Sequence, residues 1–229
     1  MESEKTFLFF DVECANCFGG VGKMCSFGYV LTDSSFNILE NDDIVMNPES
    51  EFDWFLLKNG GTSLAYPKSF FLSQKPFPFF SERIFDLICE KNRQIFAFGA
   101  LSDVGFVVTA FERYRLSIPQ FCAFDLERFC KIDGEISGSL EKRCSLLKID
   151  NSDLTAHKSS DDALMTMRLF REFLKKSNLL AETALSSRKE LFFSSSDFLK
   201  KRESKMQKKA RQKRRNESRR RDSKTIHFD

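Results

Sequence analysis

Short hydrophobic segments separated by polar turns occupy the start of the chain. Three of them, at residues 6–12, 24–32 and 36–48, predict strands, because each has the length and apolar content of a buried or half-buried strand. The turn-forming residues 33–35 join the second segment to the third. Consecutive strands with a short connection pair antiparallel, so we expect the chain to open with an antiparallel meander.

From residue 81 onward, segments with helical periodicity alternate with short apolar runs. An irregular segment at residues 49–80 is expected first, and then a helix with Ser81 as its N-terminal cap. Ser159 is expected to cap the longest helix. The expected later elements are a strand at 94–100, a helix at 103–114, a strand leading into a helix within 119–130, and helices at 138–149 and 159–176. This order predicts an α/β fold with a mixed sheet, in which three antiparallel strands precede parallel strands and helices cover both faces.

The composition is that of a globular chain with a basic end. With 229 residues, 41% of them hydrophobic, the chain can bury a full core. The formal net charge of +3 is uneven, because residues 188–229 carry 16 Lys and Arg against 6 Asp and Glu, which leaves 20 against 27 in the preceding part. We therefore expect a domain at residues 1–180 and a basic tail at residues 181–229 that is either a solvated helix or disordered.

The sequence also bears on compartment and redox state. It has no stretch with the length of a membrane span and no secretory signal pattern, so the expected location is the cytoplasm. The seven cysteines are scattered and odd in number, which favours reduced thiols. Cys14 and Cys17 could form half of a zinc site, but no second pair with ligand spacing follows, and the histidines, His157 and His227, lie far away in sequence. Ordinary buried or loop cysteines are the favoured interpretation.

Acidic residues at the ends of predicted elements are the candidate chemistry. Asp11 and Glu13 lie two residues apart at the end of the first strand, so both side chains point to one face and repel each other unless a cation lies between them. Mg²⁺ and Mn²⁺ prefer such oxygen ligands. Asp103 and Asp162 each begin a helix, where an N-terminal cap or the helix dipole would explain them equally well.

The order of these acids resembles a known family. "FFDVE" matches the first motif of the DEDD exonucleases of the RNase H-like fold, "AFGALSDVGFV" matches the second, and "HKSSDD" matches the third motif of the branch with a catalytic histidine, DEDDh, which includes the DnaQ-like 3′-5′ exonucleases. The resemblance covers residues 5–178 and includes "MNP" after the third strand and "KPFPFF" before the first helix. No single motif is decisive, but three in order with the right separation are specific.

The resemblance implies both an activity and a set of site residues. Asp11, Glu13, Asp103 and Asp162 would hold two Mg²⁺ or Mn²⁺ ions, and His157 would be the base that deprotonates the attacking water. The protein would then be a 3′-5′ exonuclease acting on the 3′ ends of single-stranded DNA or RNA. Two departures leave the choice of sugar open: "CANC" follows Glu13 where many relatives have Thr, and Gly99 stands where Asn is usual.

Other functions compete with this interpretation. A catalytically silent nucleic-acid-binding module with the same fold is the main alternative, and such a module should have lost at least one of the five residues, of which none is missing. A phosphatase of the Asp-x-Asp type would need an Asp at the position of Glu13. The basic tail is expected to add sequence-independent nucleic-acid binding in either case. The oligomeric state stays open.

Overall fold

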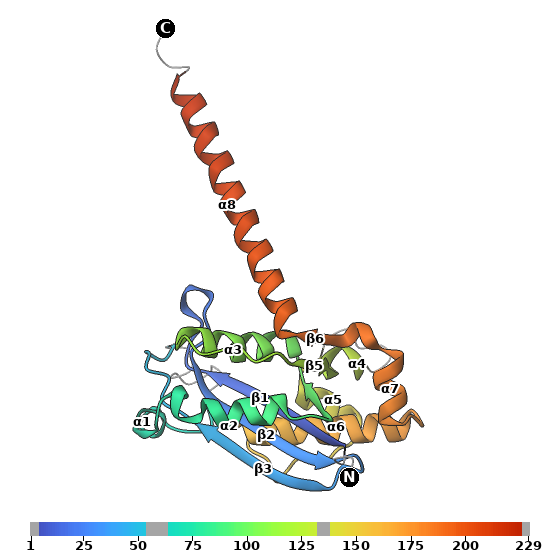
Figure 1. Ribbon diagram of the computed structural model, residues 1–229. Coiled ribbons are helices and arrows are strands. Elements are labelled where there is room, and N and C mark those ends of the chain that lie inside the picture. The colour runs from blue at the N-terminus through green and yellow to red at the C-terminus, as the bar shows by residue number, and fades with distance from the viewer. Residues whose placement is uncertain (1–4, 54–63, 132–137, 226–229) are drawn as a thin grey trace. The chain divides into compact units, whose positions relative to one another are not determined.

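The computed structural model describes residues 5–53, 64–131 and 138–225 (Figure 1). The chain divides into two compact units, Met1–Ser195 and Ser196–Asp229. The first unit contains a six-stranded sheet between helices, and the second is the greater part of one long helix.

The sheet has the strand order β3-β2-β1-β4-β5-β6. Strand β2 pairs antiparallel with both β1 and β3, whereas β4 runs parallel to β1 and β5 runs parallel to β4. Strand β6 closes the far edge antiparallel to β5. Their bounds are β1 Thr6–Cys14, β2 Met24–Asp33, β3 Ile38–Val45, β4 Arg93–Ala97, β5 Cys122–Asp125 and β6 Phe192–Ser194. The predicted mixed sheet is confirmed, and β6 is an addition that the hydrophobic pattern did not indicate.

Helices cover both faces of the sheet, as the sequence predicted. Figure 1 shows α2 and α3 on one face and α5 and α6 on the other. The bounds are α1 Lys68–Ser73, α2 Phe77–Cys89, α3 Ala100–Arg113, α4 Leu126–Phe129, α5 Leu140–Leu146, α6 Ser159–Lys176 and α7 Ala181–Ser187, with short 3₁₀ turns η1 at Phe18–Gly20 and η3 at Lys189–Leu191.

One expected helix start and one expected helix cap are wrong. Helix α2 begins at Phe77 and not at Ser81, because Pro78 lies in the first helical turn, where the fixed φ of proline suits the helix and its missing N–H has no partner to lose. The segment 49–80 is therefore not wholly irregular, and it also contains α1. Ser159 does not cap α6 but is its first helical residue, and its side chain donates a hydrogen bond to Asp43 of strand β3.

Aromatic side chains form the core on both sides of β1. On the face covered by α6, the ring of Phe9 stacks on Phe96 with centroids 4.7 Å apart and meets Phe170 of α6 at 6.2 Å. On the opposite face, Phe10 stacks on Phe27 of β2 at 5.3 Å. Burial of one such side chain contributes about 1.5–3 kcal/mol, so β1 is held firmly between two layers.

Gly28 lets helix α6 approach the sheet backbone. This residue of β2 pairs with Asp11 of β1. A Cβ atom at Gly28 would lie 2.0 Å from the carbonyl carbon of Ser159 and 2.0 Å from the nitrogen of Ser160, both at the start of α6. Non-bonded atoms do not approach so closely, so only glycine allows the first turn of α6 to lie directly over this part of the sheet.

The compact domain extends past the boundary predicted at residue 180. Strand β6 pairs with β5 in the register Cys122↔Ser194, and the backbone N–H of Ser195 donates to the carbonyl of Phe121 at 3.1 Å. Leu185 and Leu191, which lie between the predicted boundary and Ser195, are buried in the core. These long-range interactions assign residues 181–195 to the domain and not to the tail.

The tail itself is a basic helix. Helix α8 spans Ser195–Thr225. Residues 196–229 carry 14 Lys and Arg against 5 Asp and Glu. From Lys200 to Lys213 the side chains are almost all exposed, and the basic ones fall on every side of the helix because several are consecutive. Within the described ranges, no helix combines the length and the hydrophobicity needed to cross a membrane.

The close approach at Gly28 predicts the effect of adding one methyl group. Gly28→Ala should lower the free energy of unfolding by about 1–3 kcal/mol, the usual cost of overpacking, because the backbone of α6 must move away from β2. Urea denaturation measures the change. Gly138→Ala is the control, since its Cβ would meet only the side chain of Lys142, at 3.4 Å. Equal stability of Gly28→Ala and the wild type would contradict this packing.

Candidate metal centre

Strand β1 supplies two of the predicted site residues. Side chains alternate along a strand, so Asp11 and Glu13 continue the face on which Phe7 and Phe9 pack under α6. The aromatic residues are buried, whereas Asp11 and Glu13 are only half-buried, at the end where the core opens. Along this one face, the strand therefore begins in the hydrophobic core and ends in a pair of acids.

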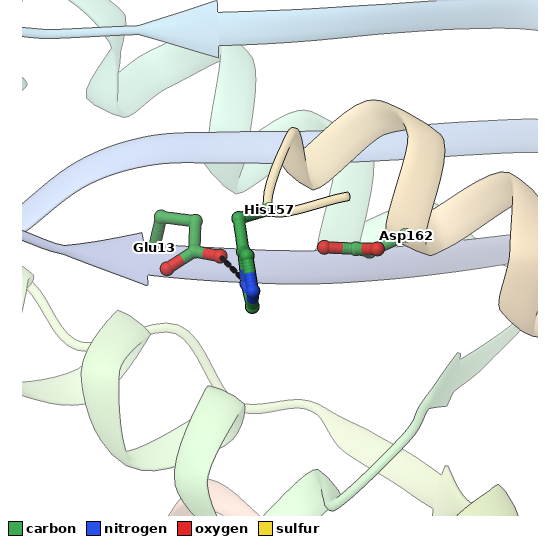
Figure 2. A group of neighbouring side chains, drawn as sticks. All are labelled: Glu13, His157 and Asp162. Atoms are coloured by element: carbon green, nitrogen blue, oxygen red, sulfur yellow. Dashed lines mark ion pairs between the residues drawn. The ribbon is translucent and has the colours of Figure 1, made fainter. Parts of the chain in front are cut away.

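The loop before α6 and the first turn of that helix supply two more. Figure 2 shows His157 and Asp162 beside Glu13 of β1. The Nδ1 atom of His157 lies 3.7 Å from Oε1 of Glu13, which is close enough for an ion pair when the imidazole is protonated. Each of the three side chains offers a ligand atom within 4.8 Å of the others. Segments that are far apart in the sequence thus meet at one point.

Hydrogen bonds fix the loop that carries His157. Asp161 accepts from the backbone N–H of Thr155 at 2.8 Å and from Nζ of Lys158 at 3.0 Å. The backbone N–H of His157 donates to the carboxylate of Asp162. His157 itself has a φ of 59°, in the left-handed region that non-glycine residues seldom adopt. The loop is therefore held in an unfavourable conformation by its neighbours.

Asp103 approaches from the other side of the sheet edge. It lies in the first turn of α3, shortly after Gly99, whose φ of 88° lets the chain turn sharply from β4 into the helix. Asp103 is only 5% exposed, and its Oδ2 atom is buried without a hydrogen-bond partner among the described residues. A buried carboxylate oxygen needs a donor or a cation, so Oδ2 of Asp103 suits a metal ligand.

Burial, followed by mutual repulsion, raises the pKa values of the acids at the site. Burial, followed by the charges of Asp162 and Asp43, raises the pKa of Glu13 to about 8. Burial and the charge of Glu141 raise the pKa of Asp162 to about 7, against the hydrogen bond from His157 that lowers it.

The two remaining acids respond in the same way. Burial, and then the charges of Asp103, Glu13 and Asp162, raise the pKa of Asp11 well above its usual range. The pKa of Asp103 is raised by burial and then by the charge of Glu13. All four acids therefore belong to one electrostatic cluster.

The described part of the chain offers these acids little positive charge. Its ion pairs include none between Lys or Arg and any of Asp11, Glu13, Asp103 or Asp162. Hard oxygen ligands without a basic partner are the donor set that Mg²⁺ and Mn²⁺ prefer. The residues present therefore fit a divalent cation.

The cysteines after Glu13 do not form a comparable cluster. Cys14 and Cys17 share a hydrogen bond between their thiols, and Cys25 donates from its thiol to the carbonyl of Glu13 at 3.4 Å. Among the described residues, the only group of three or more close metal-ligating side chains is Glu13, His157 and Asp162. The zinc interpretation of the cysteine pair thus has no third ligand in this part of the chain.

Residues of β2 and β3 that support this site carried no recognisable signal in the sequence. Asp43 bonds Ser159 at the start of α6 and also Ser26, which pairs with Glu13 in the sheet. The role of Gly28 could not be predicted from the sequence either, because a single glycine in a strand has several explanations. Only the packing of the strands against α6 reveals what these residues do.

Solved nuclease structures share this fold. E. coli exonuclease I in complex with a dA16 oligonucleotide matches with a TM-score of 0.62 and 17% identity over 80% of this chain and 43% of that one. The zinc-ion-bound form of an E. coli exonuclease I complex with single-stranded DNA matches with a TM-score of 0.63 and 17% identity, over 81% and 44%. The nuclease domain of 3′hExo, a DEDDh family member, bound to rAMP, matches with a TM-score of 0.64 and 16% identity, over 78% and 96%.

These matches establish the class of fold. The chain has the RNase H-like fold of the DEDD exonucleases, as its three motifs predicted. It spans less than half the length of exonuclease I but nearly all of the 3′hExo nuclease domain. No protein-family model and no curated protein matches the sequence.

The raised pKa values predict how stability depends on pH and metal. In the folded protein, Glu13 and Asp162 have pKa values of about 8 and about 7, above their ordinary values of 4.5 and 3.8. The folded state therefore binds more protons than the unfolded state, so the metal-free protein should lose stability as the pH rises from about 4 to about 8. Mg²⁺ favours the charged carboxylates, so it should stabilise the protein more at pH 8 than at pH 5.

Thermal unfolding with EDTA or with Mg²⁺ across this pH range measures both effects. Each kcal/mol corresponds to about 2–4 °C in Tm for a protein of this size. Glu13→Gln is the matched control, since it removes one titrating group and one ligand and should flatten both curves. A wild-type Tm that rises with pH in EDTA relative to the Glu13→Gln variant would show that the acids do not repel one another as described.

Proposed function

We propose that this protein is a metal-dependent 3′-5′ exonuclease that hydrolyses phosphodiester bonds at the 3′ ends of single-stranded DNA or RNA. The observation that carries the proposal is the meeting of Glu13, His157 and Asp162 at the end of β1, on the fold of the DEDD exonucleases. Asp11 and Asp103 complete the acidic set through their electrostatic coupling to Glu13.

The four acids would hold two Mg²⁺ or Mn²⁺ ions. Such ions lower the pKa of a bound water and neutralise the charge that develops on phosphate and leaving-group oxygens. Asp103 brings a buried, unpartnered oxygen to the set, and Glu13 and Asp162 bring ligand atoms within 4.8 Å of each other. The identity of the metal is part of the proposal.

His157 would be the general base. Its side chain is 35% exposed, so solvent reaches the imidazole, and it lies beside Glu13 and not in the core. Histidine side chains change charge between pH 5 and 8 and therefore accept protons readily at neutral pH. In the proposed step, His157 takes a proton from a water, the water oxygen forms a bond to phosphorus, and the bond from phosphorus to the 3′ oxygen of the preceding nucleotide breaks.

The similar structures support single strands with a free 3′ end as the substrates. Exonuclease I has been solved with dA16, and the 3′hExo domain has been solved with rAMP. These ligands differ in sugar, and Gly99 and the "CANC" loop of this chain depart from the pattern usual around the 3′ nucleotide. The proposal therefore covers both DNA and RNA. A silent binding module is the alternative, and the intact set of acids around His157 argues against it.

The catalytic assignment predicts the behaviour of single variants. The wild type should release mononucleotides from a 3′-labelled single strand with Mg²⁺ or Mn²⁺, and EDTA should abolish the release. His157→Ala should lower kcat by about 10²–10⁴, the usual contribution of a general base, with little change in substrate affinity. His227→Ala is the matched histidine control and should retain full turnover. Full activity in Asp11→Ala would exclude the metal-dependent mechanism. A comparison of matched DNA and RNA strands in the same assay determines the preferred sugar.

We further propose that the basic helix α8 adds sequence-independent attraction for nucleic acid. Residues 1–195 carry 22 Lys and Arg against 28 Asp and Glu, so the domain alone repels a polyanion, whereas residues 196–229 carry 14 against 5. Lys and Arg that neutralise phosphates release counterions and strengthen binding, whatever the base sequence. The polar residues of α8 are spread around the whole helix. This distribution favours binding to a charged partner over packing against an apolar surface.

Neutralising part of α8 in the full chain tests its role. A variant with Lys208, Lys209, Arg211 and Lys213 changed to Gln should bind single strands more weakly at low salt, while kcat at saturating substrate stays near normal. The slope of log affinity against log salt should fall by about 0.7 for each phosphate that the helix no longer neutralises. Fluorescence anisotropy measures it, and Gln207→Ala with Gln212→Ala is the neutral control. Unchanged salt slopes would show that α8 does not bind the strand.

A further inference from the structure

Asp43 of β3 connects the strands to the start of α6. Its Oδ1 atom accepts a hydrogen bond from Oγ of Ser159 at 2.7 Å and another from the hydroxyl of Ser26 on β2. The hydroxyls of Ser26 and Ser159 also lie within hydrogen-bond distance of each other, and because each has one proton, either can donate to the other in place of Asp43. Ser26 and Ser159 are nearly fully buried, so these bonds are shielded from water and their loss leaves polar groups unsatisfied.

The same carboxylate reaches the segment on the other side of the His157 loop. Tyr66 lies close enough to Asp43 that burial, followed by the charge of Asp43, raises the pKa of its hydroxyl. The residue before it, Ala65, donates its backbone N–H to the carbonyl of His157 at 3.1 Å. Asp43 therefore bonds the segment that follows His157 and acts through its charge on the segment that binds the carbonyl of His157.

The backbone of His157 needs such support. A non-glycine residue in the left-handed region is strained, and it stays there only where its surroundings impose it. Ser159 lies two residues after His157 and is bound to Asp43, and Ala65 holds the carbonyl of His157 itself. Release of Asp43 would loosen the restraint at Ser159, so the imidazole would lose its fixed place beside Glu13.

Asp43 differs from the four acids of the site in its hydrogen bonds. Its Oδ1 atom accepts from two serine hydroxyls, whereas those acids have no serine partners among the described residues. Its Oδ2 atom is buried without a hydrogen-bond partner among the described residues, and its charge contributes to the raised pKa of Glu13 and Asp162, so a role as a metal ligand is the competing outcome that the Mg²⁺ activation curve separates. We propose that Asp43 is a positioning residue that holds His157 in place for the reaction, an inference that rests on the proposed function.

A double-mutant cycle between Asp43 and His157 tests this role. Asp43→Ala should lower kcat by about 10–100-fold with little change in KM or in the Mg²⁺ activation curve, because a misplaced base costs rate and not substrate binding. In the His157→Ala background, the same change should lower kcat less than about twofold, since there is no base left to position. Asp43→Asn should recover most of the rate, because its amide oxygen still accepts from both serines. Equal losses in the two backgrounds would overturn the proposal.

The control is the neighbouring acid of the same strand. Asp42 is exposed, and its side chain accepts a bond from the backbone N–H of Asp43 at 2.8 Å, so Asp42→Ala should leave kcat unchanged. A loss in Asp42→Ala equal to that in Asp43→Ala would show a general effect of charge on β3 and overturn the proposal. If Asp43→Ala does not fold, Ser159→Ala removes one of the two serine donors and takes its place in the same cycle.

A second readout does not depend on activity. The chain has two histidines, so a His227→Gln background leaves the imidazole of His157 as the only histidine signal in a ¹H–¹³C NMR spectrum. Asp43→Ala should shift or broaden that signal, and Asp42→Ala should not. An unchanged signal overturns the inference about Asp43. A wild type with a normal signal but no nuclease activity would instead refute the proposed function.

Discussion

The burial of four mutually repelling carboxylates at the end of β1 is the constraint on which the rest of the site depends. Asp11, Glu13, Asp103 and Asp162 have raised pKa values, and the described chain places no Lys or Arg in an ion pair with them. Such a cluster is unstable unless protons or cations neutralise it. The packing of the aromatic layers around β1 supplies the stability that keeps the acids together despite their repulsion.

The fold gathers these acids by bringing two helix starts to one strand end. Helix α3 begins after the left-handed turn at Gly99, and the first turn of α6 lies over Gly28. Each helix presents an acid in its first turn, where the positive end of the helix dipole lessens the cost of the negative charge. A small number of backbone contacts therefore determines where all the charges lie.

The two units of the chain carry net charges of opposite sign. The acidic domain concentrates carboxylates where cations and phosphate would meet, and the helix that follows carries most of the excess positive charge. A polyanion that is repelled by the domain can be attracted by the tethered helix, because long-range electrostatics depends on net charge more than on shape. On the proposed function, this division would leave the carboxylates of the site to cations and the phosphates of a strand to the helix.

The sequence by itself determined the elements and the chemistry that depend on local pattern. The apolar run before Asp11, the alternation that puts Glu13 on the same face, and the order of the three motifs are all readable along the chain, because strand and helix periodicity are local properties. The same pattern predicted the mixed sheet and the basic tail.

Only the tertiary structure decided the contacts between distant segments. The pairing of β6 with β5 moved the domain boundary to Ser195, and the bond between Asp43 and Ser159 spans 116 residues. Ser159 has the sequence context of a helix cap, yet its side chain bonds Asp43 of strand β3. The physical reason is that a hydroxyl or a carboxylate can satisfy its hydrogen bonds locally or across the fold, and packing alone selects between the two.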